Sequence, residues 1–252
     1  MKFQKFVQTF AIALVLISIV LGCSSRPEPT AIPETSTPTL TATSDAIRFP
    51  TFTPRPTRTP DMAATQQVDD FNLLLKDYSE KGYIPSTAGS TVELDPFNES
   101  WAQIGWFQWW PYDVTGPDFV FKGHFSWSTA SETPDDSGCG VVFGLQENGD
   151  YYAVFVDYSS ILFRMKRGSR LYGVGKTSGT GKTHFTNPAE ADVVLAVANQ
   201  KAFLSVNDEI TEYTLSVDQT SAGGFALSML SGTNRDYGTR CEITNMFLWE
   251  GK

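Results

Sequence analysis

The sequence predicts an all-β fold, a two-sheet antiparallel sandwich, preceded by one amphipathic α-helix. Three observations support this fold class. Residues 119–127 (FVFKGHFSW) alternate between large apolar side chains and smaller or polar ones, as expected of a half-buried strand. An Asn-Gly pair separates GCGVVFGL from YYAVFVDY, which is the turn signal of a hairpin. Further short strand-like runs follow at regular spacing as far as CEITNMFLWE, a pattern typical of a sandwich.

Residues 1–22 have the pattern of a secretory signal peptide. Lys2 and Lys5 precede an apolar run from Phe10 to Leu21, which is shorter than the roughly 20 residues of a membrane-spanning helix. The run leads into VLGC, ending at Cys23, and this resembles the lipobox of bacterial lipoproteins. The resemblance implies that Cys23 becomes the N-terminus and carries acyl chains such as palmitate. The lipid then anchors the exported chain to the outer face of a bacterial membrane.

Residues 23–60 are expected to form the lipidated cysteine and a disordered stalk. Pro, Thr and Ser occupy 22 of the 37 positions from 24 to 60. Such a segment has too little apolar surface to offset the entropy lost on ordering. Its prolines favour an extended conformation, so the stalk is expected to hold the following domain away from the membrane.

Two common ligand classes, nucleic acid and nucleotide, do not fit the sequence. Removal of Lys2 and Lys5 with the signal leaves 28 acidic and 17 basic residues, a net charge of −11, whereas phosphate backbones require a basic face. The segment GVGKTSGTGKT (173–183) contains GKT twice. A phosphate-binding loop needs glycine five positions before the second glycine, and those positions hold Arg170 and Lys176. We therefore expect an inter-strand loop there.

Residues 61–82 predict one amphipathic helix. Asp61 is the expected N-cap, and Gly82 lies just past the expected end. Apolar side chains recur at spacings of three and four, at Val68, Phe71, Leu74, Leu75 and Tyr78. The helix is expected to pack on the domain that follows, residues 83–252.

Cys139 and Cys241 form an even pair in a chain that we expect to be exported, which favours a disulfide. Two free buried thiols are the alternative. A metal site is not expected, because His124 and His184 show no ligand spacing with these cysteines.

The strand order DFVFKGHFSW, GCGVVFGL, YYAVFVDY, FLSVND, GGFALSML, CEITNMFLWE resembles that of concanavalin A-like lectin/glucanase domains, a group that includes laminin-G-like modules. The resemblance covers about Val92 to Glu250. It implies a jelly roll of two antiparallel sheets, with carbohydrate or another extended ligand held on the concave side. Calcium is common in this fold, but no ligand cluster in the sequence requires it, and no other cofactor is expected.

Catalysis is not expected. Glucanases of this fold carry acidic residues at alternate positions of one strand, so that the carboxylates share a cleft. Asp208, Glu209 and Glu212 have the wrong spacing, and Asp157 and Glu242 each stand alone on their strands. The sequence also shows no pattern that indicates a Ser-His-Asp triad.

Aromatic and cationic side chains are the candidate ligand-binding residues. Aromatic rings stack on the apolar faces of sugars, although most large aromatic side chains lie in protein cores. Trp109 and Trp110 are adjacent and must face opposite ways on a strand. Arg164 and Lys166 are expected to point outwards, beside Tyr152 or Tyr158. The candidates are Trp106, Trp109, Trp110, Tyr112, Tyr152, Tyr158, Arg164 and Lys166.

The sequence thus favours a non-catalytic, lipid-anchored binding module at the cell surface, with a glycan or another cell-envelope polymer as its partner. A structural or protein-binding module of the envelope is the alternative. A glycoside hydrolase with an unrecognised site is a third, less favoured hypothesis.

Overall fold

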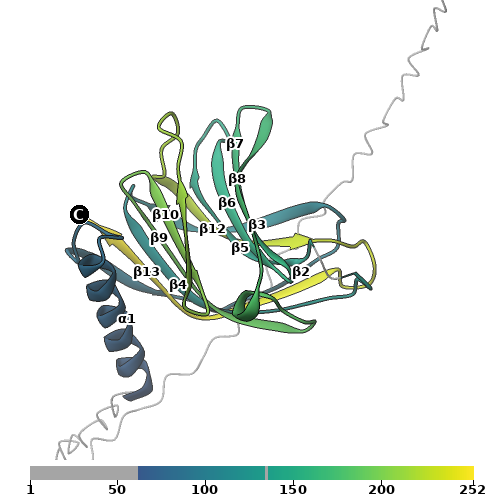
Figure 1. The fold of residues 1–252 in the computed structure, drawn as a ribbon, viewed down its shortest axis with the longest axis horizontal. Helices are drawn as coiled ribbons and strands as arrows, with labels where there is room; N and C mark the ends of the chain where they lie inside the picture. The colour runs from purple at the N-terminus through teal and green to yellow at the C-terminus, as the bar shows by residue number, and fades with distance from the viewer. Residues whose placement is uncertain (1–61, 134–135) are drawn as a thin grey trace, which may run out of the picture. The chain divides into compact units, whose positions relative to one another are not determined.

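The computed structural model describes residues 62–133 and 136–252 (Figure 1). The predicted signal peptide, the lipidation at Cys23, the stalk and the N-cap Asp61 lie outside these residues. No helix in the described part of the chain is long and apolar enough to cross a membrane.

The described residues form one α-helix, one short 3₁₀ helix and a series of β-strands. The elements are α1 (Met62–Glu80), β1 (Gly89–Leu94), β2 (Phe97–Trp101), β3 (Trp106–Thr115), β4 (Phe119–Thr129), β5 (Gly138–Leu145), β6 (Tyr151–Asp157), β7 (Ser160–Arg167), β8 (Arg170–Ser178), the short 3₁₀ helix η1 (Gly181–Thr183), β9 (Ala189–Ala198), β10 (Lys201–Val206), β11 (Glu209–Thr214), β12 (Gly223–Ser231) and β13 (Thr239–Gly251).

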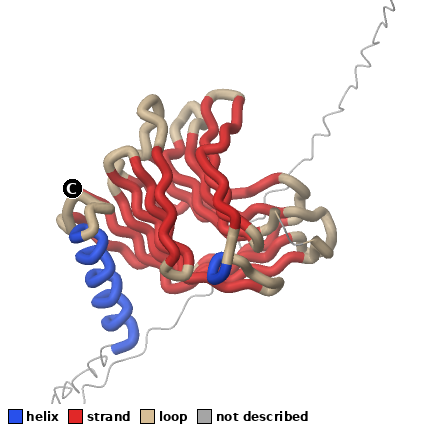
Figure 2. The backbone as a smooth tube through the Cα atoms, in the orientation of Figure 1, coloured by secondary structure: helices blue, strands red, loops and turns tan. Residues whose placement is uncertain are grey.

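The strands form two antiparallel sheets, which confirms the predicted sandwich. Sheet A has the order β1-β13-β4-β9-β10-β11, and β2 also pairs with β13. Sheet B has the order β3-β12-β5-β6-β7-β8. Strands, drawn in red, account for most of the domain in Figure 2. The two antiparallel sheets that the resemblance implied are therefore present.

The main core lies between the two sheets. The alternation predicted for residues 119–127 is correct: Phe119, Phe121, Phe125 and Trp127 on β4 all point into this core. Sheet B contributes the alternate residues of its own strands, such as Phe143 on β5. One face of each sheet therefore lines the core, and the opposite face is the outer face of the sandwich.

A disulfide joins the two sheets through this core. Cys139 on β5 of sheet B and Cys241 on β13 of sheet A are bonded, with their Cα atoms 5.7 Å apart. Both residues are fully buried. The predicted disulfide is present, and the alternative of two free thiols is wrong.

The helix α1 packs on the outer face of sheet A. Phe71, Leu75 and Tyr78 are buried there, and the ring of Phe71 stacks on that of Phe247 at 5.2 Å between centroids. Figure 1 shows α1 beside β13. Gly82, with φ of +76°, follows the helix in a conformation that glycine adopts without a steric penalty.

Two segments differ from the sequence expectations. Residues 175–178 continue β8, whereas the strand was expected to end at Val174 and the remainder of the stretch 173–183 to form a loop. The glycines do not prevent pairing here, because Gly173 and Gly175 lie opposite Arg164 and Phe163 on β7. Residues 209–214 form the edge strand β11, which the sequence did not indicate, because Glu209, Thr211 and Glu212 interrupt any apolar pattern.

Candidate functional site

The outer face of sheet B is hollowed and largely apolar. Its side chains form a cluster of their own, separate from the core between the sheets: Val142, Tyr151, Ala153, Phe155, Leu162, Ala226 and Leu230, with Phe107, Trp109 and Leu145 packed against them. No described residue of a helix belongs to this cluster. Tyr151, Phe155, Leu162 and Leu230 are nevertheless at most 8% exposed, so neighbouring side chains of the sheet itself surround them.

Four rings make up the centre of this face. Phe107 and Trp109 come from β3, and Tyr151 and Phe155 come from β6. Phe107 lies 5.0 Å from Phe155 between ring centroids, and Trp109 lies 5.3 Å from Tyr151. We call these four residues the aromatic layer. Their contacts cross β12 and β5, the two strands that separate β3 from β6 in the sheet.

Small residues on the two intervening strands leave room for the rings. Ser228 on β12 pairs with Trp109 and with Gly140 on β5, and Gly140 in turn pairs with Phe155. A Cβ atom at Gly140 would lie 2.6 Å from Cδ1 of Phe155, so the ring occupies the space that a side chain would fill. The aromatic layer therefore depends on the lack of a side chain at position 140.

A cavity of about 600 Å³ opens beside the aromatic layer. Phe107, Phe155, Leu162 and Leu230 line it. Ile104 and Leu171 also line it and are 58% and 51% exposed. Arg164, Thr133 and Asp136 add polar groups to its lining. An apolar cavity with a few convergent polar groups is the usual form of a ligand site.

Arg164 is the half-buried cation of this cavity. It lies on β7, between Ala153 on β6 and Gly173 on β8 in the strand register. Its Nη1 would be 3.6 Å from a Cβ atom at Gly173, so the guanidinium group extends over the bare backbone of β8. No hydrogen bond or ion pair joins the Arg164 side chain to another residue within the described part of the chain. Its five N–H donors are available to a ligand.

Lys166 lies on the same face but is already partnered. Its Nζ donates a hydrogen bond to the carbonyl of Gly149 at 2.7 Å and lies 5.7 Å from the centroid of the Tyr151 ring. These contacts hold the lysine at the edge of the aromatic layer. Lys166 therefore supports the position of Tyr151.

The predicted tryptophans are distributed over different environments. Trp109 lies in the aromatic layer, whereas Trp110 faces the core and contacts Phe97 at 5.3 Å between ring centroids. The two adjacent residues thus face opposite ways, as strand geometry requires. Trp106 is 63% exposed at the start of β3 and is outside the aromatic layer. Tyr112 packs against the core, and its hydroxyl donates to the carbonyl of Asp95.

The expectation that Tyr152 or Tyr158 lies beside Arg164 and Lys166 is wrong. Both tyrosines are buried between the sheets, where desolvation raises the pKa of each phenol. The hydroxyl of Tyr152 donates to the carbonyl of Gln219, and that of Tyr158 donates to Oδ1 of Asn187. Tyr151 occupies the outer face instead, since it is one residue out of phase with Tyr152.

Phe107, Tyr151, Phe155 and Leu171 contribute to the site and were missed by sequence reasoning. A signal was present in YYAVFVDY, where alternation places positions 151, 153 and 155 on one face. Every residue of this strand is apolar or aromatic up to Asp157, so the sequence does not show which face belongs to the core.

The carboxylate of Asp157 is buried, and its hydrogen bonds stabilise a turn of the fold. It accepts hydrogen bonds from the backbone N–H groups of Ser159 and Ser160 and from the Ser160 hydroxyl, which closes the turn between β6 and β7. Desolvation raises the pKa of this carboxyl group, and the hydrogen bonds oppose that shift. No group of three or more His, Cys, Asp or Glu residues that could hold a metal ion occurs within residues 62–133 and 136–252.

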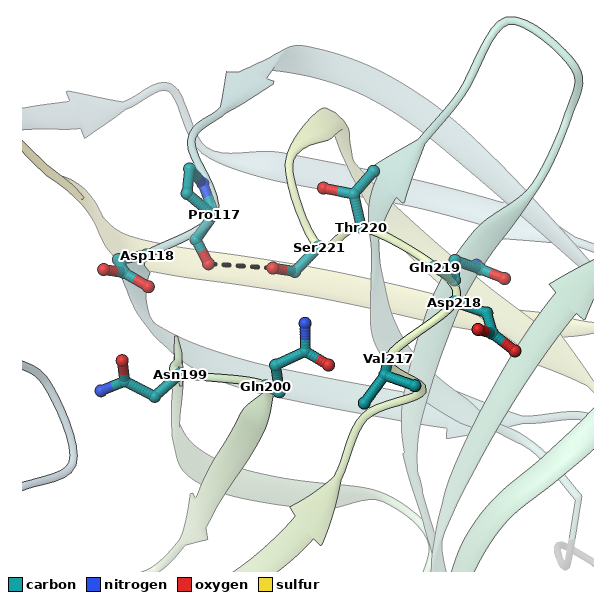
Figure 3. Close-up of a pocket in the computed structure, with 9 residues that line it drawn as sticks. All are labelled: Pro117, Asp118, Asn199, Gln200, Val217, Asp218, Gln219, Thr220 and Ser221. Carbon is teal, nitrogen blue, oxygen red and sulfur yellow. Dashed lines mark hydrogen bonds between the residues drawn. The ribbon is translucent and has the colours of Figure 1, made fainter.

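A second cleft, of about 390 Å³, lies among three loops (Figure 3). Pro117 and Asp118 form one wall, Asn199 and Gln200 a second, and residues 217–221 the third. A hydrogen bond from Ser221 Oγ to the carbonyl of Pro117 spans two of these loops, as Figure 3 shows. None of the residues lining this cleft is aromatic, so it offers no surface for stacking. The hollow face of sheet B is therefore the stronger candidate.

Neither a protein-family model nor a curated protein sequence matches the chain. Solved structures align with the chain at low sequence identity. A carbohydrate-binding module, CBM66, from Bacillus subtilis aligns with a TM-score of 0.44 and 12% identity, over 64% of this chain and 94% of that one. Sheep galectin-11 aligns with a TM-score of 0.36 and 11% identity, over 55% of this chain and 98% of that one. A beta-fructofuranosidase from Aspergillus kawachii aligns with a TM-score of 0.46 and 12% identity, over 68% of this chain and 29% of that one.

Proposed function

We propose that the domain is a non-catalytic binding module and that the hollow face of sheet B holds a glycan. The observation that carries this proposal is the cavity of about 600 Å³, with two rings of the aromatic layer in its wall and, on its lining, Arg164, which pairs with none of the residues that the structure describes. The volume falls within the range of roughly 300–1,000 Å³ that is common for small-ligand sites. One or two sugar units are therefore expected to enter the cavity.

The chemistry of the lining suits a sugar ring. The C–H face of a pyranose or furanose packs against Phe107, the partly exposed ring of the cavity wall, and this contact removes apolar surface from water. Hydroxyl groups at the ring edge accept hydrogen bonds from Arg164. Ile104 and Leu171 also line the cavity and are exposed, so they add apolar surface that a longer polymer can contact.

Replacement of one wall residue tests the proposal. Phe107→Ala removes a ring from the cavity, and Trp106→Ala, its neighbour on the strand, removes an exposed ring outside the aromatic layer. We expect F107A to weaken binding of the best glycan from an array by about 10-fold or more, through lost ring contact and apolar burial. W106A should change the affinity less than 2-fold, roughly the error of such a titration. Equal effects of the two variants, or no retention of the unmodified chain on any glycan, would contradict the proposal.

The absence of catalysis is part of the same proposal. Incubation of the chain with each glycan that it binds should release no reducing ends and no unsaturated products. Release of either that depends on an acidic residue near the cavity would make the domain an enzyme.

We also propose that the chain is exported and anchored through lipid at Cys23, so that the domain faces the outside of a bacterial membrane. The lipobox and the Pro/Thr/Ser-rich segment that follows it support this placement. Cys23→Ser should move the protein from the detergent phase to the aqueous phase in a phase-separation assay. Continued partition of C23S into detergent would contradict lipidation at this residue.

A further inference from the structure

We infer that the glycan held by the hollow face of sheet B carries carboxylate groups, and that Arg164 selects for them. This inference rests on the proposed glycan-binding function and names the chemical class of the sugar. Charge is distributed unevenly along the chain. Residues 158–189 contain six Lys and Arg residues and no Asp or Glu, in a chain whose net charge is −9.

This basic segment forms the strands β7 and β8 beside the cavity. Alternation and register place Leu162, Arg164 and Lys166 on the outer face of β7, and Lys176 pairs with Leu162 from β8. The hairpin therefore adds positive charge to one side of the site, whose lining is otherwise apolar except for Thr133 and the acidic Asp136. An acidic protein that concentrates cations at its ligand cavity attracts anions there and repels them elsewhere.

The cationic side chains of the hairpin differ in whether they already form an ion pair or a hydrogen bond within the protein. Arg167 forms an ion pair with Asp218, and Lys166 donates to the carbonyl of Gly149. Arg164 and Lys176 have no hydrogen bond or ion pair with a described residue. Arg164 is half-buried among apolar side chains, so an unpaired charge there is costly, and an anionic ligand would remove that cost.

The shape of the guanidinium group favours a carboxylate. Its planar donors match the two oxygens of a carboxylate in a bidentate hydrogen bond. A phosphate group carries more charge and commonly engages several cations, whereas Arg164 is the only Lys or Arg residue among the described residues that line the cavity. Asp136 also lines the cavity, but no ion pair joins it to Arg164. A uronic acid, with its ring on the partly exposed Phe107 and its carboxylate on Arg164, satisfies both the apolar and the cationic parts of the site.

The test compares polymers that differ only in charge. Polygalacturonate, alginate and hyaluronan are each paired with the same polymer after reduction of its carboxyl groups to alcohols. The full-length chain, solubilised in detergent, is titrated with each pair. We expect at least one acidic polymer to bind about 10- to 100-fold more tightly than its reduced form, the size of an effect expected from charge-assisted hydrogen bonds.

Variants of the basic hairpin assign the effect to one residue. Arg164→Gln should reduce the affinity for the acidic polymer to that for the reduced one, and Arg164→Lys should restore only part of it. Arg170→Gln is the matched control, because Arg170 is an exposed arginine of the same hairpin that does not line the cavity. It should change the affinity less than 3-fold, and only at low salt. Unfolding midpoints check that each variant is folded.

The outcomes separate this inference from the function on which it rests. Equal affinity for the acidic and reduced polymers, or binding of neutral glycans alone, would overturn the inference and leave glycan binding in place. Equal weakening by R164Q and R170Q would overturn the role of Arg164, and equally tight binding of dextran sulfate would overturn selection for carboxylate. Failure to bind any glycan, acidic or neutral, would overturn both proposals.

Discussion

Gly140 shows, at the scale of one residue, how a missing side chain creates the hollow face of sheet B. Its backbone lies on the central strand β5, directly under the ring of Phe155. A Cβ atom there would approach the carbonyl oxygen of Val154 and meet the Phe155 ring at 2.6 Å. The neighbouring backbone cannot move away cheaply, because it is paired on both sides within the sheet.

We therefore predict that Gly140→Ala destabilises the domain and weakens ligand binding together. The free energy of unfolding should fall by about 1–3 kcal/mol, the usual cost of overpacking. Gly116→Ala is the control, since a Cβ atom at Gly116 meets nothing within 4 Å. Urea unfolding and a glycan titration on both variants measure the two effects. A G140A domain as stable as G116A would show that Phe155 can move without cost.

Alternation along a strand predicts the orientation of a side chain correctly where one face of the strand is clearly the core face. The opposite orientations of Trp109 and Trp110 follow from strand geometry. Tyr152 was placed on the wrong face because strand β6 is apolar on both sides, as expected where both faces of a strand are buried, and Tyr158 was misplaced because it lies just past the end of this strand. Only the contacts of its neighbours show which alternate set meets the other sheet.

At the scale of elements, α1 is an amphipathic helix whose partner lies in distant parts of the chain. Its apolar stripe covers residues of β4, β9, β10 and β13, on the side of the sandwich away from the candidate site. Tyr78 is the last buried residue of this stripe. Burial raises the pKa of its phenol to about 12, and a hydrogen bond with Ser205 acts in the opposite direction.

This pKa predicts a loss of stability at high pH. The folded state holds the phenol proton more tightly than the unfolded state, so the contribution is fully present below pH 10 and is lost as the pH rises toward 12. The whole effect is at most about 2.7 kcal/mol, at 1.36 kcal/mol per pKa unit. Urea unfolding at pH 8, 10 and 11.5 should show a shallower decline for Tyr78→Phe than for the unmodified chain. Tyr172→Phe, which removes an exposed phenol, should decline as the unmodified chain does; parallel curves for all three proteins would contradict the prediction.

Sequence patterns identified most elements but not every boundary. The helix and the hairpin at Asn148-Gly149 were evident because periodicity and turn residues are local signals. β11 was missed because most residues of this edge strand are exposed, including Glu209 and Glu212, and so give no apolar pattern. The end of β8 was missed because glycine weakens any strand signal, although pairing with β7 holds it in place.

At the scale of the whole molecule, the Cys139–Cys241 disulfide links the two sheets. The cysteines are 102 residues apart, so the bond restricts a large part of the unfolded chain. The chain-entropy relation gives up to about 4.7 kcal/mol for a loop of this length. The bond connects β5, a strand of the sheet that has the hollow face, with β13, a strand of the sheet that packs against the helix.

We predict that removal of the disulfide lowers stability without changing the fold. The double variant Cys139→Ala and Cys241→Ala should lose about 2–5 kcal/mol in urea unfolding. Far-ultraviolet circular dichroism should be unchanged, and reduction of the unmodified chain should lower its midpoint in the same direction. A midpoint that reduction does not move would show that the bond constrains little of the unfolded chain.

The sequence by itself determined the class of this protein: an all-β sandwich with one helix and a cysteine pair. These features depend on local periodicity, turn residues and residue counts. Only the tertiary structure decided the site. Phe107 and Phe155 lie on strands far apart in the chain, and they meet because β12 and β5 pair between them and carry Ser228 and Gly140. Strand order in an antiparallel sandwich is set by non-local pairing, so no local pattern specifies which side chains share its hollow face.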